Sequence, residues 1–155
     1  MHKNALLLEK FYKGLQAHDH QTIAECYHPS ATFQDIAFKL SDKKKIHVMW
    51  HLISETDLKV NYKIEDTNER KGFAKWTADY TYSDTKRKVH NELRSSFVFK
   101  DGLIVEQNDD CDARKWGMQA LGPVPGLIAW LVPPIRRNKA MRKLDEFIGK
   151  HPQYR

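Results

Sequence analysis

The sequence predicts an α+β fold in which helices cover one face of an antiparallel sheet. Three segments with helical spacing of apolar residues lie within the first 54 residues, and four segments with strand-like alternation follow between residues 58 and 112. Strands that are grouped together after helices, and not interleaved with them, are typical of α+β proteins. The 155 residues, of which 41% are hydrophobic and 30% are charged, are enough for one soluble domain with its own core.

Three amphipathic helices are expected around the start of the sheet. The first, residues 3–17, carries apolar side chains at the i, i+3, i+4, i+7 spacing of one helix face: Leu8, Phe11, Tyr12 and Leu15. Asp19 is a suitable N-cap for a second, short helix that runs through Tyr27 and is ended by Pro29. Ser41 is a suitable N-cap for the third helix. The inward stripe of this third helix is expected to be Ile46, Met49, Trp50 and Ile53.

Strand alternation begins between the second and third helices. Residues 31–38, ATFQDIAF, predict a first strand. Two longer strands follow the third helix and are joined by a polar turn at residues 68–72. Their alternating inward side chains are expected to be Leu58, Val60, Tyr62 and Ile64 in one strand, and Ala74, Trp76, Ala78, Tyr80 and Tyr82 in the next.

The last two strands are expected to form a hairpin that carries the chemistry. Asp101-Gly102 tolerates the positive φ angles of a tight turn between them. The inward face of the first of these strands follows from its apolar parity: Val89, Asn91, Leu93, Ser95, Phe97 and Phe99. In the return strand Leu103 and Val105 are expected to face inward. Gln107 and Asp109 share their parity, and a carboxylate on a buried face is costly unless it is paired or used.

The end of the chain is expected to be helical. Asp112 is a suitable N-cap for a helix that begins at Ala113 and is closed by Gly122-Pro123. Residues 124–134, VPGLIAWLVPP, are apolar but far shorter than the roughly 20 residues that cross a bilayer. From Ile135 on, an apolar face opposes a basic one: Ala140, Met141, Leu144, Phe147 and Ile148 against Arg136, Arg137, Lys139, Arg142 and Lys143. This helix either folds back over the sheet or the pocket mouth, or makes a weak membrane-surface or anionic-partner contact.

The charge distribution and the cysteines limit the expected partners and compartment. The main domain is expected to comprise residues 1–122, with residues 123–155 as a basic amphipathic extension packed on it. Much of the formal charge of +6 lies in this extension, and no nucleic-acid motif accompanies it, so no nucleic-acid partner is expected. Two distant cysteines, Cys26 and Cys111, and an amino terminus without a long apolar segment favour reduced thiols in the cytoplasm.

The chain resembles the SnoaL-like branch of the nuclear-transport-factor-2-like superfamily over residues 5–122, in three stretches: FYKGLQAHDHQTIAECYHPSATFQD, VMWHLISETDLKV and WTADYTYSDTKRKVHNELRSSFVFKDGLIVEQNDDCDARKWGMQALG. The resemblance implies a cone-shaped barrel, in which a strongly bent, mostly antiparallel sheet wraps around the helices and leaves a pocket at its wide end. It also implies a homodimer. Relatives include ketosteroid isomerase, polyketide cyclases and limonene-epoxide hydrolase, together with members that have no catalytic activity.

The resemblance further implies two catalytic carboxylates. Asp35 matches the general base of ketosteroid isomerase, and its strand neighbours of the same parity are apolar, so it is expected to face inward. Asp109 matches an acid or base on the last strand of the cyclases and the epoxide hydrolase. Burial would raise the pKa of such a carboxyl toward the range that is useful at neutral pH. The isomerase's oxyanion donors are not matched, because their places hold Phe11 and Ser95.

Structural interpretations of the two carboxylates stay open. Asp35 could cap a turn, and Asp109 could form a buried salt bridge with Lys10 or Arg114. An epoxide hydrolase would need an Arg and a second Asp on the neighbouring strand. No Arg is found there, and Asp79 is expected to face solvent.

The remaining candidates complete the hypothesis. The predicted ligand-binding residues lie on inward faces: Tyr12, Trp50, Trp76, Tyr80, Asn91, Ser95, Phe97 and Gln107. His47, His51 and Glu55 lie one turn apart, but beside the apolar stripe and without an evident fourth ligand, so neither a metal nor a cofactor is predicted. We expect a cofactor-independent acid/base enzyme of isomerase or cyclase type that acts on a small apolar carbonyl compound. The alternatives are a non-catalytic ligand-binding or dimerisation module and an epoxide hydrolase.

Overall fold

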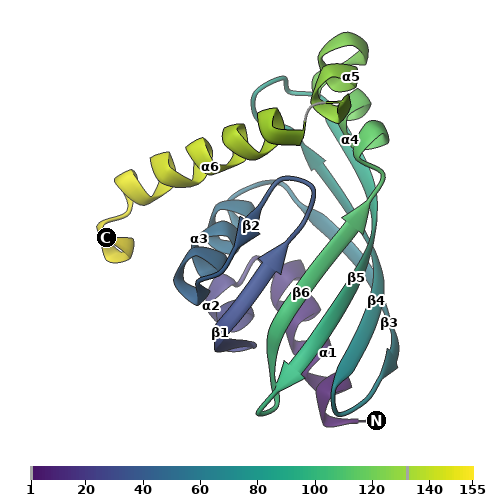
Figure 1. Ribbon diagram of the computed structural model, residues 1–155, viewed down its shortest axis with the longest axis vertical. Coiled ribbons are helices and arrows are strands. Elements are labelled where there is room, and N and C mark those ends of the chain that lie inside the picture. Colours follow the sequence, from purple (N-terminus) through teal and green to yellow (C-terminus); the bar gives the residue numbers. More distant parts are fainter. Residues whose placement is uncertain (1, 132) are drawn as a thin grey trace.

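The computed structural model describes residues 2–131 and 133–155, without the side chains of residues 124, 127, 129 and 131. Figure 1 shows the helices and strands, which in chain order are α1 Lys3–Gln16, α2 His20–Glu25, β1 Tyr27–Gln34, β2 Lys39–Leu40, α3 Lys43–Ser54, β3 Lys59–Thr67, β4 Lys71–Thr81, β5 Lys88–Lys100, β6 Leu103–Cys111, α4 Ala113–Leu121, α5 Pro123–Leu131, α6 Pro133–Lys150 and the short 3₁₀ helix η1 Pro152–Tyr154.

The strands form one curved sheet of six strands in the order β2-β1-β6-β5-β4-β3. The pairing of β1 with β6 is parallel, and the other neighbouring strands are antiparallel. The sheet bends around α1, α2 and α3 without closing on itself, as Figure 1 shows. The predicted α+β class and cone-like arrangement are therefore confirmed, as an open, mixed sheet.

The core fills the concave side of the sheet with aromatic side chains. The ring of Phe11 on α1 lies edge-on to those of Tyr12 and Trp50, with centroid distances of 4.9 and 5.5 Å. Edge-to-face contacts of this kind add to the stabilisation that burial of the rings already provides. The parity predicted for β5 is confirmed, since Val89, Ser95, Phe97 and Phe99 are all buried.

Two predicted boundaries on the way into the sheet are wrong. The second helix ends at Glu25, and Tyr27 is already the first residue of β1, so Pro29 lies within that strand. A strand tolerates proline at an irregularity, and the register of β1 against β6 shifts between Tyr27 and Thr32. The predicted first strand also stops early, because Asp35 begins a turn after Gln34 that leads into β2.

The N-cap of the third helix is Asp42, whereas Ser41 was the predicted cap. The Asp42 Oδ1 atom accepts a hydrogen bond of 2.8 Å from the backbone N–H of Lys44, and α3 begins at Lys43. The caps predicted at the other two helices are confirmed. Asp19 accepts from the N–H of Thr22, and Asp112 accepts in the same way at the start of α4.

A register shift corrects the inward face predicted for the last strand. Val98 pairs with Glu106 while Phe99 pairs with Ile104, so β6 has one extra residue at this point. Ile104 is fully buried as a result, and Leu103 and Val105, which were expected to face inward, are only partly buried. Beyond the irregularity the parity is as predicted, and Gln107 and Asp109 are buried.

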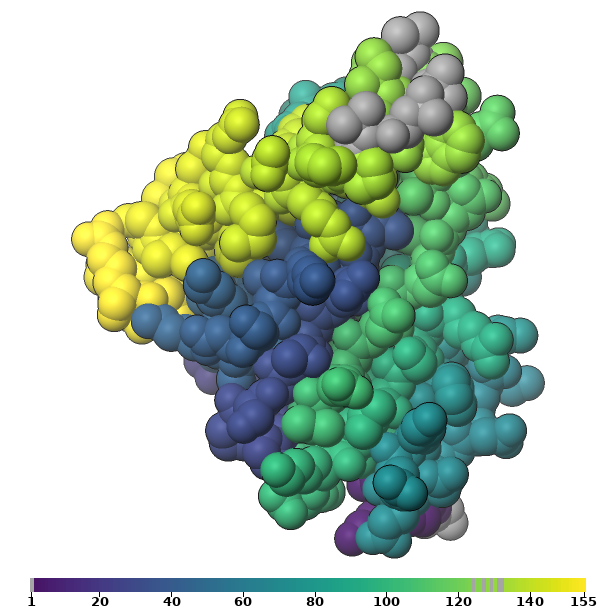
Figure 2. Space-filling model, viewed as in Figure 1, coloured from purple at the N-terminus to yellow at the C-terminus, as the bar shows by residue number. Residues whose placement is uncertain are grey.

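The carboxy-terminal helices cover the open end of the sheet (Figure 1). Gly117 of α4 and Gly126 of α5 let the two backbones meet, because a Cβ built on Gly126 would lie 2.3 Å from the Gly117 carbonyl oxygen. α6 buries Ala140, Leu144 and Phe147. Figure 2 shows the carboxy-terminal segment, in yellow, lying over the blue segment that contains β2 and α3. Within the described residues, no helix is both long enough and apolar enough to cross a membrane.

Candidate functional site

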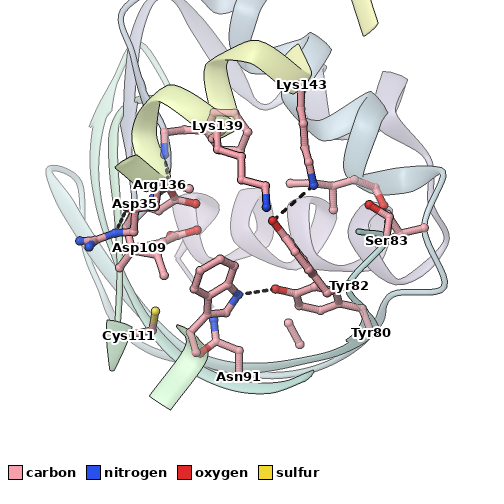
Figure 3. Close-up of a pocket in the computed structure, with 18 of the residues that line it drawn as sticks. Asp35, Tyr80, Tyr82, Ser83, Asn91, Asp109, Cys111, Arg136, Lys139 and Lys143 are labelled. Carbon is pink, nitrogen blue, oxygen red and sulfur yellow. Dashed lines mark hydrogen bonds between the residues drawn. The ribbon is translucent and has the colours of Figure 1, made fainter. Parts of the chain in front are cut away.

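A cavity of about 570 Å³ lies between the concave face of the sheet and α3, α4 and α6. Figure 3 shows part of the set of side chains that line it. The volume is typical of a pocket for a small molecule. Most of the wall is apolar and includes Trp50, Leu58, Trp76, Ala78, Leu93 and Trp116. Asp35 and Asp109 both line this cavity, from the turn after β1 and from β6 respectively.

Asp109 is held by two side-chain donors. Its Oδ1 atom accepts hydrogen bonds of 2.5 Å from Ser95 Oγ and 3.0 Å from Gln107 Nε2. Ser95 in turn accepts a bond of 2.8 Å from the indole N–H of Trp76. Since both bonds go to Oδ1, the other carboxylate oxygen is the one left for the cavity.

A second chain of bonds fixes the orientation of the Gln107 amide. The indole N–H of Trp50 donates to the hydroxyl of Tyr27 at 2.9 Å, and that hydroxyl donates to Gln107 Oε1. With its oxygen engaged in this way, Gln107 must turn its NH₂ group toward Asp109. Tyr12 lies in the same layer, where burial and the charge of Asp109 raise its pKa.

The environment raises the pKa of Asp109 to about 7. The main cause is burial, because the residue is only 3% exposed and its charged form loses its hydration. The hydrogen bonds from Ser95 and Gln107 lower the pKa, and the negative charge of Asp35 raises it further. The predicted alternative of a salt bridge to Lys10 does not occur, since Lys10 pairs with Glu25 at 2.9 Å.

Asp35 is half-buried in the turn between β1 and β2. Its Oδ1 atom accepts from the backbone N–H groups of Ala37 and Phe38, at 2.7 and 2.6 Å. The guanidinium group of Arg136 donates to the carbonyl oxygen of Ile36, as Figure 3 shows. That of Arg137 donates to the carbonyl oxygen of Asp35. Burial raises the pKa of Asp35, while the two N–H donors and the two arginines oppose that rise. Asp35 therefore does cap a turn, as the structural interpretation proposed, and it lines the cavity as well.

Polar donors face the carboxylates from the sheet. The indole N–H of Trp116 donates to the hydroxyl of Tyr80 at 2.6 Å (Figure 3), and among the described residues no acceptor binds the hydroxyl hydrogen of Tyr80. That hydrogen is available to a ligand. Burial raises the pKa of Tyr80 to about 12, so it stays protonated at neutral pH. Asn91 lines the same wall beside Cys111 and provides a second donor.

The basic face of α6 turns partly toward the cavity. Lys139 and Lys143 each lie 3.0 Å from Asp84 Oδ2, and their ammonium groups lie 5.4 and 4.4 Å from the ring centroid of Tyr82. The sequence analysis placed both lysines on the basic face of this helix but did not predict that they line the cavity. The spacing of four residues between the two lysines indicates a shared face of the helix, but not which surface that face would meet.

The predicted ligand-binding residues divide into two groups. Trp50, Trp76, Tyr80 and Asn91 line the cavity. Tyr12, Ser95 and Gln107 form the buried layer beneath Asp109, and Phe97 packs deeper, against the rings of Phe11 and Phe99. Asp79 does not line the cavity, and its Oδ1 atom lies 2.6 Å from His90 Nδ1. Ligand contact by any of these residues stays a prediction.

One group of side chains with the spacing of metal ligands is found among the described residues. It consists of His51, Glu55 and His151, and none of the three lines the cavity. Two of the three, His51 and Glu55, belong to the group one helical turn apart that the sequence analysis identified with His47. The third comes from the end of the chain, where no spacing in the sequence could connect it to α3.

Comparisons with solved structures give the same fold with distant sequences. A polyketide cyclase candidate from Silicibacter sp. TM1040 is 16% identical with a TM-score of 0.69, and the match covers 76% of this chain and 94% of that one. An LEH-like epoxide hydrolase from M. tuberculosis is 17% identical with a TM-score of 0.62 and coverages of 84% and 96%. An isomerase candidate from Bacillus subtilis is 16% identical with a TM-score of 0.65, and the match covers 79% of this chain and 96% of that one.

The curated proteins offer no match to the sequence. The profile of the SnoaL-like domain, by contrast, matches residues 8–107, which run from α1 into β6 and include most of the sheet and Asp35. This match spans well over half of the chain. The protein therefore belongs to the SnoaL-like domain family.

Proposed function

We propose that the protein is a cofactor-independent acid/base enzyme, of isomerase or cyclase type, that acts on a small apolar carbonyl compound. The observation that carries the proposal is the pair of carboxylates at one apolar cavity, of which Asp109 titrates at about pH 7. Proton transfer is fastest when the catalytic group has a pKa near the working pH. Solved relatives described as cyclase and isomerase candidates support the same reaction class.

The two carboxylates have different roles in this proposal. Asp35 receives two backbone N–H bonds and lies near two arginines, all of which favour its charged form, so it serves as the base. Asp109 keeps its proton up to about pH 7 and serves as the acid. Asp35 takes a proton from the carbon beside the carbonyl, and the electron pair moves to the carbonyl oxygen. Asp109 donates its proton to that oxygen, which gives an enol. Asp35 then returns its proton to a different carbon of the substrate while Asp109 takes back the proton from the oxygen, so both carboxyl groups end as they began.

The negative charge that develops on the substrate oxygen needs donors. The Tyr80 hydroxyl, polarised by the bond from Trp116, and the Asn91 amide face the cavity from β4 and β5. These two groups take the place of the donors that the sequence comparison with the isomerase did not find. A donor of this kind typically contributes roughly 10²–10³ in rate.

Proton exchange is a direct test that needs no knowledge of the natural substrate. A panel of cyclic ketones and enones is incubated with the protein in D₂O, and deuterium at the carbon beside the carbonyl is followed by NMR. Wild type is expected to accelerate exchange, and Asp109→Asn and Asp35→Asn are each expected to lose roughly 10²–10⁴ of that rate. The rate should also fall above about pH 7, where Asp109 loses its proton.

Asp110→Asn is the matched control, because Asp110 lies next to Asp109 on β6 but is exposed. Equal exchange rates in wild type and Asp109→Asn would refute the acid/base proposal. Saturable binding of panel compounds without exchange would favour the second candidate, a non-catalytic binding module, which the largely apolar cavity wall also supports. Adding an epoxide to the panel tests the third candidate, since the LEH-like hydrolase is among the similar structures.

A further inference from the structure

Outside the cavity, four histidines from three parts of the chain meet beside α3. His20 Nδ1 lies 2.8 Å from His47 Nε2, and the rings of His20 and His51 stack with a centroid distance of 3.7 Å. The ring of His151, which follows α6, lies 5.2 Å from that of His51. All four are partly buried and none lines the cavity, so the proposed acid/base chemistry does not use them.

Two of these histidines converge on one carboxylate. His51 Nε2 lies 3.4 Å from Glu55 Oε1, and His151 Nε2 lies 4.0 Å from the same oxygen. One ligand atom from each of the three residues falls within 4.8 Å of the others. Bonds of about 2.0–2.2 Å to a tetrahedral zinc ion would hold such atoms roughly 3.3–3.5 Å apart. Small side-chain rotations therefore bring all three atoms to bonding distance.

The outer nitrogens of the two rings are already engaged. His151 Nδ1 lies 2.8 Å from the carbonyl oxygen of Phe147, which can only accept, so this nitrogen carries the hydrogen. His51 Nδ1 lies 2.7 Å from the hydroxyl of Tyr154, which can accept in the same way. Both Nε2 atoms then face Glu55. Metal-binding histidines usually have this arrangement, in which the outer nitrogen donates to a carbonyl or another polar group.

The chemistry of the three side chains indicates the class of ion. His51 Nε2 and His151 Nε2 lie near the same Glu55 oxygen, so one cation could contact all three atoms. Two imidazoles and one carboxylate suit zinc or a similar divalent transition metal better than magnesium or calcium, which prefer oxygen ligands.

We propose that His51, Glu55 and His151 bind one zinc ion, or a similar divalent transition metal, with the fourth position left to water. His51 and Glu55 belong to α3, whereas His151 lies between α6 and η1. The ion would therefore fasten the carboxy-terminal end of α6 to the main domain. Because residues of α6 line the cavity, including Lys139 and Lys143, the same ion would also hold the cavity cover in place (Figure 1).

Metal titration of the untagged, chelator-treated protein tests the site. Zn²⁺ is expected to bind with one ion per chain by calorimetry, and Co²⁺ to give the visible absorption of a tetrahedral site. His151→Ala and His51→Ala should each weaken binding at least 10-fold. At a Zn²⁺ concentration of about 100 times Kd, the Tm of wild type should rise by roughly 5–10 °C.

Two further variants make the outcome decisive. Glu55→Gln removes a ligand from a side chain that is 56% exposed, so it should fold normally and still lose affinity. His90→Ala removes an exposed histidine on β5 that pairs with Asp79, and it should bind Zn²⁺ like wild type. The Tm of each variant is compared with and without Zn²⁺, so a loss of intrinsic stability does not mask the result. Absence of stoichiometric binding, or binding that His151→Ala and Glu55→Gln leave unchanged, would overturn the proposal.

Discussion

Replacing Asp109 with asparagine is expected to stabilise the protein at neutral pH while it removes the proposed activity. In the fold the pKa of this carboxyl is raised to about 7, whereas an unfolded chain has about 3.9. Between these two values the unfolded chain releases the proton and the folded chain keeps it, so the stability of the wild type falls as the pH rises. The stabilising contribution of the protonated Asp109 carboxyl is fully present below about pH 4 and is lost by about pH 7.

The size of this loss follows from the same two pKa values. A gap between about 7 and about 3.9 corresponds to roughly 4 kcal/mol. An asparagine Oδ1 can accept the bonds from Ser95 and Gln107 in the same way, and its NH₂ group would face the cavity in place of the second carboxylate oxygen. We therefore expect Asp109→Asn to exceed wild type by about 2–4 kcal/mol at pH 8, and by much less at pH 4.

Urea denaturation at several pH values between 4 and 8 measures this difference directly. The free energy of unfolding of the variant minus that of wild type should grow steadily with pH. Groups that titrate elsewhere cancel in this difference, because both proteins contain them. Asp110→Asn, an exposed neighbour on the same strand, should give a difference near zero at every pH. A constant difference for Asp109→Asn would mean that its carboxyl titrates normally, and the acid/base reasoning would fail.

Further changes test the packing around the site. Gly126→Ala should destabilise the protein by roughly 1–3 kcal/mol in thermal or urea unfolding, because its Cβ would meet the Gly117 backbone. Gly149→Ala is the helical control, which should gain up to about 1 kcal/mol, since nothing lies within 4 Å of the added methyl. Ser95→Ala should cost roughly 1–3 kcal/mol by leaving the buried Trp76 N–H unpaired. In wild type the hydrogen bond from Ser95 lowers the pKa of Asp109, so its loss should raise that pKa. The alkaline limb of the exchange profile should therefore shift to higher pH.

Much of the fold could be predicted because burial acts on one side chain at a time. Alternation in β5 identified Ser95 and Phe97 as inward residues, and helical spacing identified the buried stripe of α1. Asp109 was found by the same reasoning although its premise was wrong. The extra residue in β6 leaves Leu103 only partly buried and buries Ile104 in its place, yet the strand regains its parity before Gln107.

The features that were missed depend on contacts between distant segments. Periodicity shows that Lys139 and Lys143 share a helix face, but their position at the cavity depends on how α6 crosses the sheet, and Asp84 contributes the acceptor. His151 meets His51 only because the chain folds back over α3 after 100 residues. Such pairings are set by the packing of whole elements, and no local pattern in the sequence contains them.

The chemical identity of residue 109 is itself an argument for function. Its oxygen accepts bonds from Ser95 and Gln107, and an asparagine could accept both without the cost of ionisation. At neutral pH that cost is roughly 4 kcal/mol, a large part of the 5–15 kcal/mol that typically holds a domain folded. A residue with a purely structural role would not need a group that titrates. The carboxyl adds the ability to hold and release a proton beside a cavity, and that ability is what the comparison of Asp109→Asn with wild type isolates.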